Sequence, residues 1–228
     1  MEKRFLGVLL IFLFALDIQA QNEYQLGFLP KFNLNKGLSQ GFKLNLKLES
    51  RQLLRRGTFG ENNDWQYDYS LTDFAAVMSK KSGVRSSFAA GIQIRRRNEQ
   101  WFYRLIQQFS FVQKYPQFRL GHRFGLDQTF VDGSSPSFRF RYRISAELPI
   151  SGQQVDRGEL YVKIGNEYLP RLQASSASME IRLLPVLGLN FTDNNKLELG
   201  LDYRMDRFSN PEGFRQSYWM VVAWYIKI

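Results

Sequence analysis

The chain contains no cysteine and only one histidine. Without thiols it can form neither disulfide bonds nor zinc–thiolate sites. A single histidine restricts histidine-based acid–base catalysis to mechanisms built on His122. Beyond its N-terminal segment, the sequence has no apolar run near the roughly 20 residues that a membrane-spanning helix requires. It also has no capped helical periodicity and no Gly/Ser linker. These absences argue against a helical fold and against a domain boundary within the chain.

The N-terminal segment has the features of a secretory signal peptide. A short basic stretch precedes a nearly continuous apolar run from Phe5 to Leu16, and Ala20 supplies a small residue at the expected cleavage point. The apolar run is too short for a mature membrane-spanning helix; the alternative is a retained anchor. We therefore predict a signal peptide at residues 1–20 and one exported domain at residues 21–228.

The run Phe138–Ile144 is the most informative stretch of the sequence. Apolar residues occupy its even positions and arginines occupy the odd positions between them. A period of two indicates a β-strand whose two faces meet different surroundings. Because burying an unpaired charge is costly, the arginine face must meet water or carboxylates. The apolar face would meet a second sheet in a soluble protein, or lipid in an outer-membrane barrel.

Similar two-faced segments recur along the chain, about eleven in all. Many have the roughly 9–11 residues that a membrane-spanning strand needs. Bacterial single-chain barrels normally have an even number of strands, so we expect ten or twelve. The predicted fold is therefore an all-β, single antiparallel up-and-down transmembrane β-barrel of about 10–12 strands. Loops are expected at Gln52–Asp64 and Pro170–Ser178, with a β-bulge near Thr72 and Asp73 where the alternation changes phase.

One face of these strands carries charges of both signs, which predicts cross-strand ion pairs. In lipid this face would line a narrow lumen, and the apolar face would point outward. The ladder would either close the lumen and fix the strand register, or bias a narrow pore toward anions; the structural interpretation is favoured. The predicted lumen-lining charge ladder comprises Arg95, Arg97, Arg119, Arg123, Arg139, Arg141, Arg143, Glu147, Glu159, Lys163, Glu180, Arg182, Glu198, Asp202 and Arg204. Lys43, Lys47, Glu49 and Asp127 share the same face.

Several further features favour an outer-membrane location in a Gram-negative cell. The last strand ends in alternating apolar residues at Ile228, which resembles the recognition signal of the barrel-assembly machinery, although that signal prefers a terminal Phe or Trp. The balance of 31 Lys and Arg against 21 Asp and Glu suits lipid or anionic solutes, and an exported location argues against nucleic acid. Neither a cofactor nor a metal is expected. Nine aromatic residues are predicted to form membrane-interface girdles: Trp65, Tyr67, Tyr69, Trp101, Tyr103, Tyr218, Trp219, Trp224 and Tyr225.

Five short segments carry a family resemblance: residues 121–130, 138–143, 162–168, 188–191 and 197–204. They are spread over most of the mature chain and are similar to segments of the DUF2490 family of bacterial outer-membrane barrels, common in Bacteroidota. The family has no established activity. The resemblance therefore implies a fold and a location, and it implies no chemistry.

Two other functions stay open on the sequence alone. The first is an outer-membrane lipid-modifying hydrolase that uses His122 as its base. The phase of the strand places His122 beside apolar Leu120 and Phe124, and no partner serine is identifiable, so a structural histidine is favoured. The second is a periplasmic soluble barrel that binds a hydrophobic ligand, because turning every strand over would satisfy the same alternation. We expect a non-enzymatic membrane barrel.

Overall fold

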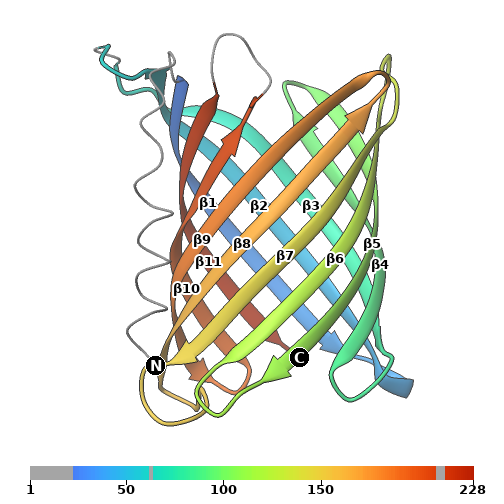
Figure 1. Cartoon of the computed structure of the whole chain (residues 1–228), viewed down its shortest axis with the longest axis vertical. Coiled ribbons are helices and arrows are strands. Elements are labelled where there is room, and N and C mark those ends of the chain that lie inside the picture. Colours follow the sequence, from blue (N-terminus) through green and yellow to red (C-terminus); the bar gives the residue numbers. More distant parts are fainter. Residues whose placement is uncertain (1–22, 62–63, 209–213) are drawn as a thin grey trace, which may run out of the picture.

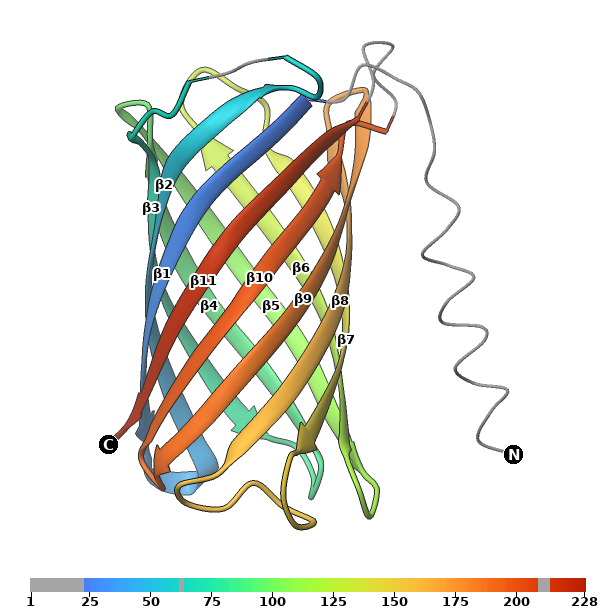
Figure 2. The ribbon, with the colours of Figure 1, turned by 90° about the vertical axis from the view of Figure 1, so that its left-hand side faces the viewer.

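The computed structural model describes residues 23–61, 64–208 and 214–228, and these residues form one closed β-barrel (Figures 1 and 2). The predicted signal peptide lies outside the described residues. Within them, no helix is long and apolar enough to cross a membrane. The strands are β1 (Glu23–Gly37), β2 (Phe42–Thr58), β3 (Asp68–Lys81), β4 (Ser86–Arg97), β5 (Gln100–Lys114), β6 (Arg119–Val131), β7 (Ser137–Pro149), β8 (Leu160–Gln173), β9 (Ser176–Thr192), β10 (Asn195–Asp206) and β11 (Arg215–Lys227), with a short 3-10 turn, η1 (Ser39–Gly41), after β1.

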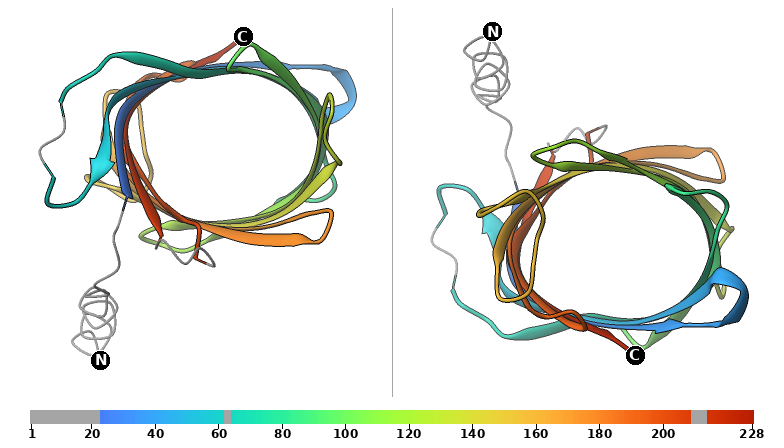
Figure 3. Two further views of the ribbon diagram at one scale, coloured as in Figure 1. Left: turned by 90° about the horizontal axis from the view of Figure 1, so that it is seen from above. Right: turned by 90° about the horizontal axis from the view of Figure 1, so that it is seen from below.

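The barrel is closed by a parallel pair of strands. Neighbours in the chain pair antiparallel all round the ring, and β1 then pairs in parallel with β11, from Glu23 opposite Arg215 to Asn35 opposite Lys227. The view along the axis shows the closed oval ring (Figure 3). The all-β barrel prediction is confirmed, but the expectation of an even strand count is wrong. Strands that alternate in direction require an even number only if the first and last strands also pair antiparallel.

The alternation of each strand separates an apolar outer face from an ionic inner face. On β7, Phe138 and Phe140 are 44% and 50% exposed on the outer wall. On the inner face, the carboxylates of Asp127 and Glu167 are almost fully buried. The largest fully buried side chains of the barrel therefore include charged residues, the reverse of the arrangement in a protein with an apolar core.

Two β-bulges explain why some predicted boundaries are wrong. Opposite β1, the register skips Leu54, and opposite β2 it skips Ser70. Each extra residue shifts the alternation by one, so the residues beyond it alternate in the opposite phase and the combined stretch does not show a single continuous pattern. As a result, much of the predicted loop Gln52–Asp64 belongs to β2. The phase change expected near Thr72 lies two residues earlier, at Ser70.

The predicted loop Pro170–Ser178 is also wrong. Strand β8 runs to Gln173 and β9 begins at Ser176, so only a two-residue turn separates them.

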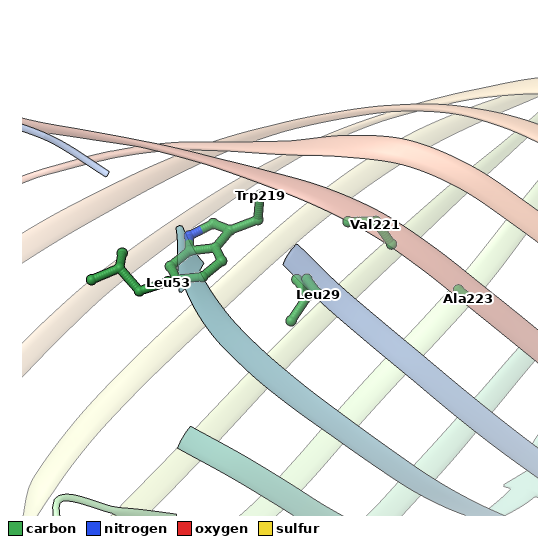
Figure 4. Packing of buried hydrophobic residues seen from close by; sticks show 5 residues of the cluster. All are labelled: Leu29, Leu53, Trp219, Val221 and Ala223. Atoms are coloured by element: carbon green, nitrogen blue, oxygen red, sulfur yellow. The ribbon is translucent and has the colours of Figure 1, made fainter. Parts of the chain in front are cut away.

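A small apolar cluster lies inside the barrel at the parallel seam. It comprises Leu29, Leu53, Trp219, Val221 and Ala223, from β1, β2 and β11 (Figure 4). The guanidinium groups of Arg51 and Arg204 lie 5.8 and 6.0 Å from the centre of the Trp219 ring. The indole is therefore packed against apolar side chains while two cations lie over its faces. This cluster ties the first two strands to the last.

Gly27 makes room for this indole, since it lies directly opposite Trp219 in the seam register. A Cβ atom at position 27 would lie 2.4 Å from Trp219 Cζ3 and 2.6 Å from the backbone oxygen of Gln52. We expect Gly27→Ala to destabilise the barrel by about 1–3 kcal/mol, because the ring or the strand must move. Denaturant unfolding of the detergent-solubilised protein measures this loss. The matched control is Gly37→Ala, since no described atom crowds the corresponding Cβ position; an equal loss in both variants would contradict the packing argument.

Of the aromatic residues predicted to form membrane-interface girdles, most are exposed, but the prediction is wrong for two that point inward. Trp65, Tyr67, Tyr69, Trp101, Tyr103 and Trp224 are exposed, and Tyr218 is partly exposed. Trp219 and Tyr225, in contrast, point into the barrel: Trp219 is buried in the seam cluster, and the Tyr225 hydroxyl donates to Glu198. Both occupy odd positions of β11, and these positions face inward. The girdle prediction rested on their aromatic character and did not take this parity into account.

Candidate functional site

The inner wall holds a continuous chain of ion pairs across β6, β7, β8 and β9. Asp127 Oδ2 on β6 accepts from Arg139 Nη2 at 2.5 Å and from Arg141 Nη2 at 3.2 Å, both on β7. Register explains the first contact, because Asp127 and Arg139 are directly opposite each other. Two arginines thus share the buried Asp127 carboxylate, and Arg141 also continues the series of ion pairs to β8.

Glu167 on β8 continues the chain. Its Oε1 lies 3.4 Å from Arg141 Nη1, and its Oε2 lies 3.4 Å from Arg182 Nη1 on β9. Arg182 Nε in turn donates to Glu180 at 2.5 Å. Charges therefore alternate in sign from one strand to the next, which lets ionised groups persist away from bulk water. We call this set the ion chain; it comprises Arg139, Asp127, Arg141, Glu167, Arg182 and Glu180.

A second group of ion pairs lies near the seam. Glu49 on β2 is 2.8 Å from Lys47 Nζ and 2.9 Å from Arg51 Nη2. Asp202 on β10 holds Arg204 through two hydrogen bonds of 3.0 and 2.7 Å. Lys31 on β1 lies between the two carboxylates, 3.9 Å from Glu49 and 3.8 Å from Asp202. Ion pairs as well as the apolar cluster therefore connect the strands on the two sides of the parallel seam.

Two smaller groups of paired charges lie elsewhere on the inner wall. Arg95 binds Asp73 through hydrogen bonds of 2.6 and 2.7 Å, between β4 and β3. Glu198 accepts from Lys163 and from the hydroxyl groups of Tyr161 and Tyr225. These contacts join strands that are neighbours or near neighbours, so each pair fixes the local register.

One family model matches residues 28–215: that of the protein family of unknown function DUF2490. The chain belongs to the DUF2490 family. The match covers most of the barrel, from β1 to the start of β11. Neither the curated proteins nor the solved structures contain a match to this chain.

Most of the predicted ladder residues of this DUF2490 chain lie on the inner wall, but they fall into three groups. The first group is ion-paired: Arg95, Arg139, Arg141, Lys163, Glu180, Arg182, Glu198, Asp202 and Arg204, with Arg119 and Glu147 3.7 Å apart near the end of the barrel. The second group, Arg97, Arg123 and Arg143, has no ion pair among the described residues. The third is Glu159, which lies in the turn before β8, where its carboxylate accepts from the Asp156 backbone.

Several residues of the network are missing from the predicted ladder. Glu167 has the same odd parity as Lys163 on β8, so its signal was present in the sequence. Asp73 follows the Ser70 bulge, which hides its parity, and Lys31 follows Pro30, which breaks the pattern. Arg104 on β5, another inward cation, donates to Thr129 and Gln93 at 2.9 and 3.4 Å.

The inner wall offers ionic and hydrogen-bonding chemistry. Within the described residues, no group of three or more His, Asp or Glu side chains could hold a metal ion.

His122 lies on β6 with its Nδ1 3.0 Å from the Tyr142 hydroxyl, and its ring stacks on Phe111 at 4.5 Å. In the part of the chain that the structure describes, its hydrogen-bond partner is therefore a tyrosine, and neither a serine nor a carboxylate.

Proposed function

We propose that this DUF2490 chain is a small, non-enzymatic outer-membrane β-barrel whose ionic interior braces the wall from within. The observation that carries the proposal is the apolar outer wall. Residues in the middle of their strands, such as Ile92 and Leu199, are 53% and 49% exposed. Apolar exposure on this scale around a whole barrel is unfavourable in water, whereas in a bilayer it is the expected outer surface.

The two alternative functions are less well supported. A soluble barrel that binds a hydrophobic ligand needs an apolar interior, but the most deeply buried side chains here include Glu167, Asp127 and Asp202. A hydrolase built on His122 needs a nucleophile beside the imidazole, and the neighbours of this ring are Tyr142 and Phe111. Both observations favour a barrel that does no chemistry on lipid.

Membrane fractionation tests the proposal. We expect the expressed chain to sediment with outer membranes, to resist alkaline carbonate and to require detergent for extraction. A folded barrel should also migrate differently on a denaturing gel before and after boiling. A chain that stays in solution without detergent, with the same mobility in both samples, would refute the membrane location.

A narrow channel is a second candidate, favoured by the accessibility of Arg123. This side chain lies on the inner face of β6, yet it is exposed, so water reaches part of the interior. Inward arginines without carboxylate partners would favour anions over cations in such a path. Conductance steps with anion preference in planar bilayers would support the channel, and a silent bilayer would leave only the structural role.

A further inference from the structure

Several rungs of the inner wall carry two like charges, among them Arg182 opposite Arg204, but each of those two arginines forms an ion pair with a carboxylate. Along β6 and β7, the directly opposed inward pairs include Arg119 with Glu147 and Asp127 with Arg139, each of opposite sign. Between them, Arg123 lies directly opposite Arg143. Like charges in directly opposed positions destabilise a sheet. This rung therefore costs stability in the empty barrel unless something negative lies beside it.

No carboxylate of the described residues forms an ion pair with either cation, although Glu167 attracts both electrostatically. Arg123 Nε donates to the Ser110 hydroxyl at 3.4 Å, and neither guanidinium forms an ion pair in the described part of the chain. The nearest candidate by register is Glu167, directly opposite Arg143 on β8. Its two oxygens already contact Arg141 and Arg182. Neither cation of the rung is therefore held in an ion pair, and both can donate to an external anion.

The wall around this rung is built of small residues. Gly121 and Gly125 flank Arg123 on the inner face of β6, and Ser145 faces Gly121 from β7. On β8, a Cβ atom at Gly165 would lie 3.4 and 3.5 Å from Nη2 and Nε of Arg143, so that guanidinium packs against the glycine. Each of the two guanidinium groups is planar with five donors, and water reaches Arg123.

We infer that Arg123 and Arg143 form a binding site for a compact oxyanion of the phosphate class inside the barrel. Guanidinium groups bind phosphate oxygens through paired, charge-assisted hydrogen bonds, and two of them match the double charge of a phosphate dianion. The anion would replace the repulsion across the rung with attraction to both strands. The site goes beyond the proposed function, because it requires only the folded barrel, in a membrane or in a micelle.

The test uses the full-length barrel refolded in detergent, with inorganic phosphate as the probe and sodium chloride at equal ionic strength as the reference. We expect phosphate to raise the denaturant midpoint of the wild-type protein, because it binds only the folded state. Arg123→Gln and Arg143→Gln should each weaken phosphate binding roughly tenfold or more, the effect of losing a charged hydrogen bond. Arg119→Gln, at the rim and paired with Glu147, is the matched control and should keep the response.

A second readout separates a binding role from a merely structural one. Without phosphate, Arg123→Gln should be as stable as the wild type or more stable, because the substitution relieves the repulsion across the rung. A destabilised or unfolded Arg123→Gln barrel would overturn the inference. So would an unchanged phosphate response in that variant, or no response in the wild type. Because these measurements are made in micelles, their results can be interpreted even if the proposed membrane location is wrong.

Discussion

Replacing Glu167 with glutamine should destabilise the barrel by about 3–5 kcal/mol, the usual cost of breaking a buried ion pair from one side. Glu167 is only 2% exposed, and it separates Arg141 from Arg182. An amide of the same shape preserves the packing but leaves the two guanidinium groups facing each other across a neutral group. Denaturant unfolding in detergent, monitored by tryptophan fluorescence, measures the loss.

The control is an ion pair of similar geometry in a different environment. Arg207 lies 2.8 Å from Glu23, but about two-fifths of each side chain is exposed. Exposed pairs contribute at most about 1 kcal/mol, so Glu23→Gln should change the stability little. The double variant Glu167→Gln, Arg182→Gln should regain part of the loss, because it removes one of the uncompensated cations. Equal small effects of Glu167→Gln and Glu23→Gln would mean that the ion chain does not brace the wall.

An arginine at position 92 should impair stable insertion of the barrel. Ile92 lies near the middle of β4, flanked on the outer wall by Ala76 of β3 and Leu105 of β5. An arginine on the lipid face near the bilayer midplane costs about 2–4 kcal/mol. We expect Ile92→Arg to lower the folded fraction in lipid vesicles, as measured by heat-dependent gel mobility and by the unfolding midpoint.

Val84→Arg is the matched control in the same hairpin. Val84 lies in the β3–β4 turn and is 99% exposed, so its replacement should change the stability by no more than about 0.5 kcal/mol. If the barrel were soluble, both sites would face water and both substitutions would be mild. Comparable folding of the two variants in vesicles would therefore contradict a lipid-facing outer wall.

The sequence was sufficient for the fold class because the period of two survives in most strands. Phe138–Ile144 shows both faces of β7 without interruption, and in the structure Phe138 and Phe140 are exposed while Arg139 and Arg141 beside them are less so. The pattern failed where an extra residue shifts the phase, at Leu54 and Ser70. The strand count failed for a different reason: the direction in which β1 meets β11 depends on tertiary closure, which local alternation does not encode.

The inner charges were harder to predict than the strands that carry them. Parity alone indicates that Arg141 and Asp127 share a face, but their contact depends on the register between β6 and β7 and on the reach of a long side chain across the lumen. Glu167 has the correct parity but no distinctive neighbours in the sequence. The opposition of Arg123 and Arg143 is likewise a product of register, since the two residues are separated by the β6–β7 turn.

Site-directed spin labelling tests the central claim most directly, because the chain has no native cysteine. Ala75 and Ala76 are adjacent near the middle of β3 and lie on opposite faces; Ala75 is 5% exposed toward the interior. A nitroxide on Ala76→Cys should collide often with oxygen, which concentrates in lipid, and rarely with a water-soluble nickel chelate. A nitroxide on Ala75→Cys should be shielded from oxygen. The reverse order of oxygen accessibility, or free access of the chelate to position 76, would contradict an apolar wall that faces the bilayer.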